Sequence, residues 1–284
     1  MTIKSVTVVG TGTMGNGIAG QAALSGYDVV LFDIDENRAQ EAVQNIKRTY
    51  KKGVEKGKVD AMAAEVAVKR IASSNQLEDA ISNAGLIIEA VPEQMELKKT
   101  LFATFEQHGR DDVLMATNTS SLSITEIASS VKSPERVVGM HFFNPVAIMP
   151  LVELVRGEFT SKQTLKAVRD VAESMGKQCI EVNDSPGFAT SRLGIALGNE
   201  AMRMFEEGVA SAEDIDKAMV LGYRHPIGPL ALTDLVGLDV RLAISEHLHY
   251  EIGSDAFRPP RILRKMVRAG KLGRKVGRGF YEYS

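Results

Sequence analysis

The chain has 284 residues, of which 44% are hydrophobic and 25% are charged, and its formal net charge at pH 7 is −2. These values are typical of a soluble globular protein with one large or two ordinary domains, and they favour neither nucleic acid nor a membrane surface as a partner. No apolar run approaches the length of a bilayer, and the opening residues enter a strand directly. We therefore expect no targeting segment and a cytoplasmic location.

The one cysteine, Cys179, excludes an intrachain disulfide and a cysteine-based metal site, and we predict no bound metal. It lies in an alternating, strand-like run at 177–182. An inert core thiol is the simpler interpretation, because free cysteine is usually buried. A reactive thiol is the alternative, but no obvious base adjoins Cys179 in the sequence.

Strand-like and helix-like segments alternate through the first two thirds of the chain. The predicted strands are 4–9, 28–33, 70–73, 85–91, 112–117, 136–142, 150–156 and 177–182. The predicted helices are 13–26, 36–52, 60–68, 93–108, 122–130 and 161–175. This alternation is typical of βαβ units and predicts an α/β domain with a doubly wound, mostly parallel sheet of the Rossmann-like kind.

The pattern changes at Asn-Asp-Ser-Pro-Gly-Phe, residues 183–188, which are breakers and caps. The segments beyond it are mostly helical, at 187–207, 211–221, 229–250 and 258–269, with a strand-like or extended ending at 279–283. We therefore expect two domains, an α/β domain over 1–184 and a smaller all-α domain over 185–284.

The first predicted strand runs into the glycine-spaced turn Gly-Thr-Gly-Thr-Met-Gly at 10–15. Gly10 permits the tight turn, Gly12 lets the backbone approach a pyrophosphate, and Gly15 lets the next helix sit close on the sheet. The helix N-terminus offers free N–H groups to the phosphates. Asp33 ends the second strand, where such folds hold the adenosine ribose. Its carboxylate would repel a 2′-phosphate, so the pattern predicts NAD rather than NADP.

Histidine has the natural pKa range for the proton transfer that accompanies hydride transfer from an alcohol. His141 lies at the carboxyl end of the predicted strand 136–142, where ligands bind in open α/β sheets. The chain then turns back into a strand that contains Glu153, which could orient the imidazole and stabilise its cation. The other four histidines are in less suitable positions: His108, His225, His247 and His249.

A second strand end is rich in hydroxyl groups, Ala-Thr-Asn-Thr-Ser-Ser-Leu at 116–122. One hydroxyl is needed to cap the next helix, and Ser121 and Ser123 are the candidates. Capping does not require the whole cluster, so Ser120 or a neighbour could hydrogen-bond a substrate oxygen. The basic segment 48–58 is similarly open to two interpretations, a solvated helix end or a site for a phosphorylated part of the substrate.

Taken together, these motifs resemble those of the L-3-hydroxyacyl-CoA dehydrogenase family, particularly its short bacterial members. The resemblance runs nearly end to end. Its motifs are Gly10–Gly15, Glu89–Glu93, Asn118–Ser121, His141–Pro145, Ser185–Phe188, Gly228–Leu230 and Gly277–Tyr281. It implies reversible, NAD-dependent oxidation of a short 3-hydroxyacyl-CoA, such as 3-hydroxybutyryl-CoA, to the 3-oxoacyl-CoA, such as acetoacetyl-CoA. It also implies a homodimer formed through the C-terminal domain.

The resemblance also implies roles for individual residues. His141 would be the general acid–base, Glu153 its orienting partner, and Ser120 a contact to the substrate's 3-oxygen. Thr49 and Lys56 would contact the CoA moiety. NAD would lie along the remaining positions: Gly10, Gly12, Thr13, Met14, Gly15, Asp33, Ala90, Glu93, Lys98, Ser120 and Asn144, the last also lying near the substrate.

The chain departs from the family pattern at Ser191, where the family usually has an asparagine that contacts the acyl group. Serine has a shorter reach and a single donor, which leaves the acyl preference open. A related dehydrogenase of hydroxy acids or sugar acids without CoA is one alternative. A non-catalytic NAD(H)-sensing module is another, but Ser120, His141 and Glu153 would be superfluous in a sensor.

Overall fold

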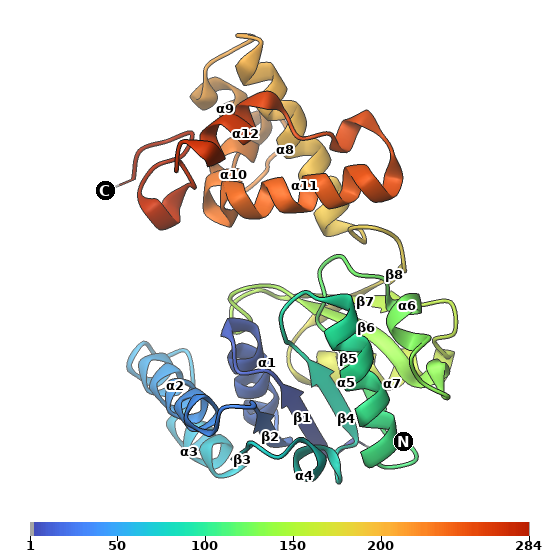
Figure 1. The fold of residues 1–284 in the computed structure, drawn as a ribbon. Helices are drawn as coiled ribbons and strands as arrows, with labels where there is room; N and C mark the ends of the chain where they lie inside the picture. The colour runs from blue at the N-terminus through green and yellow to red at the C-terminus, as the bar shows by residue number, and fades with distance from the viewer. Residues whose placement is uncertain (1–2, 284) are drawn as a thin grey trace. The chain divides into compact units, whose positions relative to one another are not determined.

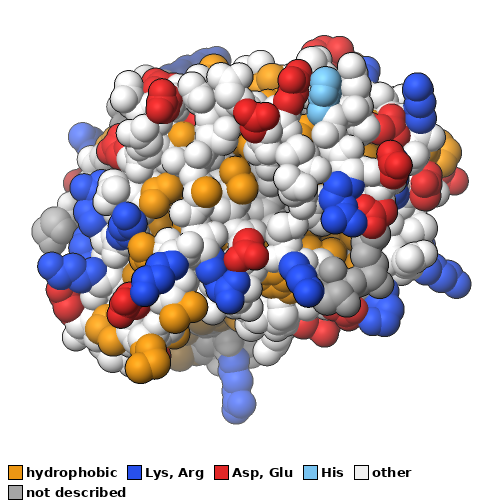
Figure 2. All heavy atoms as spheres, turned by 90° about the horizontal axis from the view of Figure 1, so that it is seen from below, with side chains coloured by type: hydrophobic (Ala, Val, Ile, Leu, Met, Phe, Trp, Pro, Cys, Tyr) orange, Lys and Arg blue, Asp and Glu red, His pale blue; other side chains and the backbone are white. Residues whose placement is uncertain are grey.

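The computed structural model describes residues 3–283, which form two compact units with the boundary in the chain between Ser185 and Pro186 (Figure 1). Among these residues no helix is both long enough and apolar enough to cross a membrane. On the face shown in Figure 2, Lys and Arg side chains are interspersed with Asp and Glu, in keeping with the small net charge.

The first unit is built on one eight-stranded sheet in the order β3-β2-β1-β4-β5-β6-β7-β8. The strands are β1 (Ser5–Val9), β2 (Asp28–Phe32), β3 (Ile71–Ser74), β4 (Leu86–Glu89), β5 (Leu114–Thr117), β6 (Val137–Phe142), β7 (Leu151–Arg156) and β8 (Gln178–Asn183). All neighbours are parallel except β6 and β7, which are antiparallel. The mostly parallel sheet predicted from the sequence is confirmed, and the strand order reverses direction at β1, the topological switch point of such folds.

Helices flank this sheet (Figure 1). They are α1 (Thr13–Leu24), α2 (Glu36–Glu55), α3 (Ala61–Lys69), α4 (Leu77–Ile81), α5 (Met95–His108), α6 (Ile124–Ala128) and α7 (Lys162–Ser174), with a 3₁₀ turn at Pro134–Arg136. Helix α2 illustrates why they form. Asp35 caps it by accepting the N–H groups of Asn37 and Arg38, and its buried residues Ala39, Ala42 and Ile46 recur every three or four positions.

The core of the first unit explains the continuous apolar runs of its central strands. Every residue of β4 and β5 is buried, as expected for parallel strands covered on both faces. Two buried residues of these strands, Glu89 and Thr117, are nevertheless polar, and both lie at the carboxyl ends of their strands. Buried polar side chains therefore lie at the carboxyl edge of an otherwise apolar sheet.

The second unit is all-α, as predicted. Its helices are α8 (Thr190–Glu206), α9 (Ala212–Gly222), α10 (Pro229–Val236), α11 (Leu238–Ile252) and α12 (Arg261–Arg268), with 3₁₀ turns at Asp255–Phe257 and Arg274–Val276. They pack around a cluster of buried apolar residues that includes Met202, Leu230, Leu238 and Leu263.

One expectation for this unit was wrong. The single helix predicted over 229–250 is divided at Gly237, whose φ of +103° suits glycine and begins a new helix. The ending at 279–283, expected to be strand-like or extended, takes part in an isolated bridge between Arg278 and Glu282 but forms no full strand. Asp234 holds it instead, accepting the backbone N–H groups of Phe280 and Tyr281 at 2.9 Å each and the Tyr283 hydroxyl at 2.9 Å.

Candidate active site

The three glycines of the turn after β1 have different physical reasons to be glycine. A Cβ on Gly10, whose φ is +106°, would lie 2.6 Å from the Ala90 carbonyl oxygen, and one on Gly15 would lie 1.8 Å from the Gly10 carbonyl oxygen. A Cβ on Gly12 would meet no atom within 4 Å. Gly10 and Gly15 are therefore required by packing, whereas Gly12 faces open space that a ligand can enter.

The N-terminus of α1 suits an anion. Its N-cap is Gly12, which provides no side-chain cap, so the first N–H groups of the helix are left for an external acceptor. Thr13 is exposed and Met14 packs against the core of the unit. This cradle fits the pyrophosphate of a dinucleotide.

Asp33 lies beside the glycine turn, as the sequence predicts. Its Oδ2 accepts the Thr11 hydroxyl at 2.5 Å and its Oδ1 accepts the Asp35 N–H at 3.1 Å. The role of Thr11 was not foreseen, although a hydroxyl inside the glycine turn was visible in the sequence. The contact fixes the carboxylate next to the turn, where it suits a ribose hydroxyl and opposes a 2′-phosphate.

A buried ion pair follows β4. The Lys98 ammonium lies 2.7 and 2.8 Å from the two carboxylate oxygens of Glu89, and both side chains are at most 1% exposed. The Glu89 carboxylate also accepts the Val91 N–H at 2.7 Å and the Thr117 hydroxyl at 2.6 Å. These bonds offset the cost of burying the charges. Neither Glu89 nor Thr117 was among the predicted site residues.

Glu93 connects this ion pair to the hydroxyl-rich loop after β5. One of its oxygens lies 3.3 Å from the Lys98 ammonium. The other accepts the Thr119 hydroxyl at 2.5 Å and the Ser120 N–H at 3.1 Å. Lys98, Glu93 and Ser120, predicted separately, therefore belong to one hydrogen-bonded group.

The loop itself resolves which serine is the cap. Ser123 is the N-cap of α6, because its hydroxyl accepts the Glu126 N–H at 3.2 Å. Ser120 is half-buried, and within residues 3–283 its hydroxyl has no hydrogen-bond partner. Capping therefore does not use Ser120, whose hydroxyl is available to a ligand.

His141 and Glu153 are register partners on the antiparallel pair β6 and β7. The His141 Nδ1 lies 2.8 Å from the Glu153 Oε2, with the imidazole 9% and the carboxylate 0% exposed. A carboxylate at Nδ1 favours the tautomer with its proton on that nitrogen and its lone pair on Nε2. Asn118 adds a bond to the same strand end, since its Oδ1 accepts the Phe142 N–H at 2.9 Å.

Most of the predicted residues gather at one edge of the sheet. The glycine turn follows β1, Ala90 follows β4, Ser120 follows β5, and His141 ends β6. These strands are parallel neighbours, so their carboxyl ends share an edge. Asn144 lies exposed in the turn beyond β6.

Three predicted residues belong to other elements of the chain. Thr49 and Lys56 are exposed at the C-terminal part of α2, where the Thr49 hydroxyl donates to the Asn45 carbonyl at 2.9 Å. Ser191 is in the first turn of α8, in the second unit.

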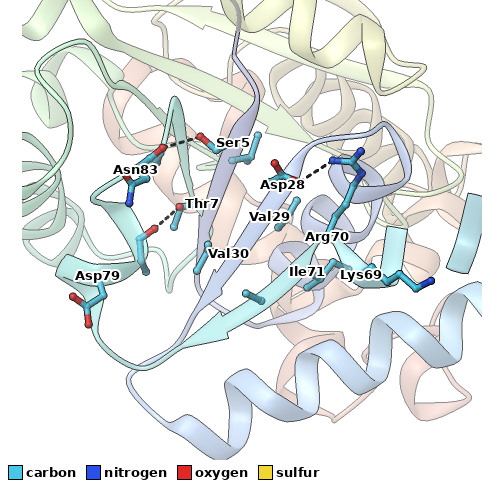
Figure 3. Close-up of a pocket in the computed structure, with 14 residues that line it drawn as sticks. Ser5, Thr7, Asp28, Val29, Val30, Lys69, Arg70, Ile71, Asp79 and Asn83 are labelled. Atoms are coloured by element: carbon cyan, nitrogen blue, oxygen red, sulfur yellow. Dashed lines mark hydrogen bonds and ion pairs between the residues drawn. The ribbon is translucent and has the colours of Figure 1, made fainter. Parts of the chain in front are cut away.

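A cavity of about 410 Å³ lies at the opposite, amino edge of the sheet, between the starts of β1, β2 and β3 (Figure 3). Several of the polar groups that line it are already engaged in hydrogen bonds or ion pairs. Arg70 pairs with Asp28 at 2.8 Å, and Thr7 donates to the Ala80 carbonyl at 2.6 Å. None of the predicted site residues lines it.

Comparison with known proteins agrees with this geometry. Residues 5–185 match the NAD binding domain of 3-hydroxyacyl-CoA dehydrogenase, and residues 187–283 match its C-terminal domain. The chain is 45% identical to a probable 3-hydroxybutyryl-CoA dehydrogenase of Bacillus subtilis, over 100% of this chain and 98% of the relative. It is 45% identical to the 3-hydroxybutyryl-CoA dehydrogenase of Clostridioides difficile, over 98% and 99% of the two chains.

A solved structure gives the same result. The crystal structure of (S)-3-hydroxybutyryl-CoA dehydrogenase from Ralstonia eutropha is 42% identical, covers 100% of both chains and superposes with a TM-score of 0.95. The resemblance recognised in the motifs is thereby confirmed. The chain belongs to the 3-hydroxyacyl-CoA dehydrogenase family and is an NAD-dependent oxidoreductase.

Proposed function

We propose that this protein interconverts short L-3-hydroxyacyl-CoA thioesters, such as 3-hydroxybutyryl-CoA, and the 3-oxoacyl-CoA thioesters, with His141 as the general acid–base. The observation on which this proposal rests is the buried pair of the His141 Nδ1 and the Glu153 Oε2, 2.8 Å apart. The pair lies at the strand edge that also bears the glycine turn and the Ser120 loop.

In the oxidation direction the 3-hydroxyl group loses its proton to Nε2 of His141 as the carbon–hydrogen bond breaks, and a ketone forms. NAD supplies the acceptor for the hydride. The Glu153 carboxylate stabilises the imidazolium that forms, and the Ser120 hydroxyl donates a hydrogen bond to the 3-oxygen. In the reverse direction His141 returns the proton to that oxygen.

The chain's own residues suit the dinucleotide at both ends. The Gly12 cradle and the N-terminus of α1 would bind the pyrophosphate, with Asp33 on the adenosine ribose. Ala90, Glu93, Lys98 and Asn144 would lie along the nicotinamide half. Since Asp33 opposes a 2′-phosphate, we expect NADH to be used in strong preference to NADPH.

The CoA and acyl portions would contact residues outside the strand edge. Thr49 and Lys56 on α2 would bind the CoA moiety, where exposed lysines attract phosphate groups. Ser191 would contact the acyl group in place of the usual amide. The helical unit, residues 185–284 by our sequence prediction, would thus serve the substrate.

We assign the same unit a role in forming a homodimer. Several of its large apolar side chains are exposed, among them Leu193 (71%), Leu235 (53%) and Val240 (42%). Exposed apolar side chains that adjoin one another are typical of interaction surfaces. We also expect the enzyme to act in the cytoplasm.

The test is the consumption of NADH on addition of acetoacetyl-CoA. The parent enzyme should turn over, and His141→Gln should lose about 10²–10⁴-fold in kcat while binding NADH normally in a fluorescence titration. No turnover with any 3-oxoacyl-CoA, short or long, would reject the proposed activity. Full activity of His141→Gln would reject only the role of His141.

A further inference from the structure

Lys177 is a buried lysine that the proposed reaction does not use. It lies between α7 and β8, is 7% exposed, and has no carboxylate within ion-pair distance among residues 3–283. Burial lowers the pKa of its ammonium group. Two backbone carbonyl groups offset the cost of burying this charge. The ammonium donates to the Val146 oxygen and, at 3.0 Å, to the Met149 oxygen.

Both carbonyls belong to the turn that joins β6 to β7. Within the turn, the N–H groups of Ile148 and Met149 donate to the Pro145 carbonyl at 3.0 and 2.9 Å, so these two bonds do not use the carbonyls at 146 and 149. Lys177 supplies them from a position 31 and 28 residues further along the chain. The turn begins directly after Asn144 and leads into the strand of Glu153.

The same turn packs against α1, the helix that follows the glycine turn. A Cβ on Gly17 of α1 would lie 2.8 Å from the Val146 side chain, so the two segments are in close contact. The segment before Lys177 is also tied to α1, because the Gln21 side chain donates to the Met175 carbonyl at 2.9 Å. The turn is therefore held between α1 on one side and the Lys177 ammonium on the other.

An apolar side chain would fill the position of Lys177 without the cost of burying a charge. The ammonium adds only its directed hydrogen bonds to the turn. We propose that Lys177 is a positioning residue, which fixes the turn at 145–149 and thereby holds Asn144 in place for the nicotinamide half of NAD. This inference depends on the proposed function for the role of Asn144.

The first experiment compares Lys177→Met with Lys166→Met, an exposed lysine of α7 that pairs with Asp170. We expect Lys177→Met to raise the dissociation constant of NADH about tenfold, because a turn that has lost a charge-assisted hydrogen bond must be ordered again when NADH binds. The KM for acetoacetyl-CoA should change less than the dissociation constant of NADH, although Asn144 is also expected near the substrate. The melting temperature should remain near that of the parent. Hydrogen exchange at 146–149 should accelerate. Lys166→Met should match the parent in all four measurements.

A double-mutant cycle with Asn144→Ala tests the route. If Lys177 acts through Asn144, Lys177→Met should weaken NADH binding much less in the Asn144→Ala background than in the parent. The proposal would be overturned if Lys177→Met weakened NADH binding by the same factor in the Asn144→Ala background as in the parent. It would also be overturned if Lys177→Met left the NADH affinity unchanged. Should Lys177→Met not fold, Lys177→Gln, which keeps one donor group, is carried through the same cycle. NADH affinity is measured without turnover, so a failure of the proposed activity is distinguishable from a failure of this inference.

Discussion

His141 and Glu153 face each other across the antiparallel strands β6 and β7, and their side chains form a buried contact of 2.8 Å between Nδ1 and Oε2. Because the contact is part of the sheet register, the orientation of the imidazole is fixed by backbone hydrogen bonds rather than by a mobile loop. The Glu153 carboxylate thereby favours the tautomer that carries its proton on Nδ1.

Glu153→Gln should lower kcat by about 10²–10⁴-fold, because the amide keeps the shape but can neither fix the tautomer nor stabilise the imidazolium. Steady-state kinetics with acetoacetyl-CoA measure this loss. The dissociation constant of NADH should stay within about twofold of the parent value, since Glu153 contacts the imidazole and not the glycine turn. An unchanged kcat would show that the carboxylate is only structural.

Gly12 and Gly15 provide a matched pair of substitutions. Gly12→Ala should weaken NADH binding at least about tenfold while changing the free energy of unfolding by less than about 0.5 kcal/mol, because its new methyl group enters only the open cradle. Gly15→Ala should instead destabilise the fold by about 1–3 kcal/mol, since its Cβ meets the Gly10 carbonyl. Fluorescence titration and urea denaturation measure the two effects, and equal effects on both would contradict this division of roles.

Substitutions in the buried pair of Glu89 and Lys98 should affect the free energy of unfolding and the NADH affinity differently. Glu89→Gln leaves a buried ammonium with weaker compensation, and we expect a loss of about 3 kcal/mol in the free energy of unfolding. The double variant Glu89→Leu/Lys98→Met should recover most of that loss. It should not recover NADH affinity, because Glu93 loses its contact with Lys98.

The control for that series is Lys99→Met, which breaks a solvent-exposed pair with Glu96. It should change the free energy of unfolding by less than about 1 kcal/mol. Recovery of NADH affinity in the double variant would mean that Glu93 holds the Ser120 loop without Lys98.

Lys56 tests the assignment of CoA to α2. Lys56→Ala should lower kcat/KM for acetoacetyl-CoA by about three- to tenfold, as expected for one exposed charge beside a phosphate. It should leave the value for a short thioester analogue without the nucleotide unchanged. Lys69→Ala, which removes an exposed lysine of α3 paired with Glu65, is the control. An equal loss with both substrates would remove the support for a CoA contact at Lys56.

The sequence by itself determined the sheet, the helical unit and the cofactor. Apolar periodicity is a local property, so the strands and most helices could be predicted from it, and the order of glycine turn, second strand and Asp33 indicated NAD. Even the meeting of His141 and Glu153 was predictable, because a short turn between two strands returns the chain antiparallel to itself.

Only the tertiary structure decided the contacts between segments far apart in the chain. Thr117 bonds Glu89 across 28 residues, and Lys177 reaches Val146 across 31, because the order of strands in the sheet brings those segments together. The division of the helix at Gly237 has the same origin. The positive φ of Gly237 accompanies long-range contacts of the next helix, including the Asp239 carboxylate, which accepts the Lys275 ammonium at 2.6 Å. Local patterns fix which elements form, whereas the partners of their polar side chains depend on how those elements pack.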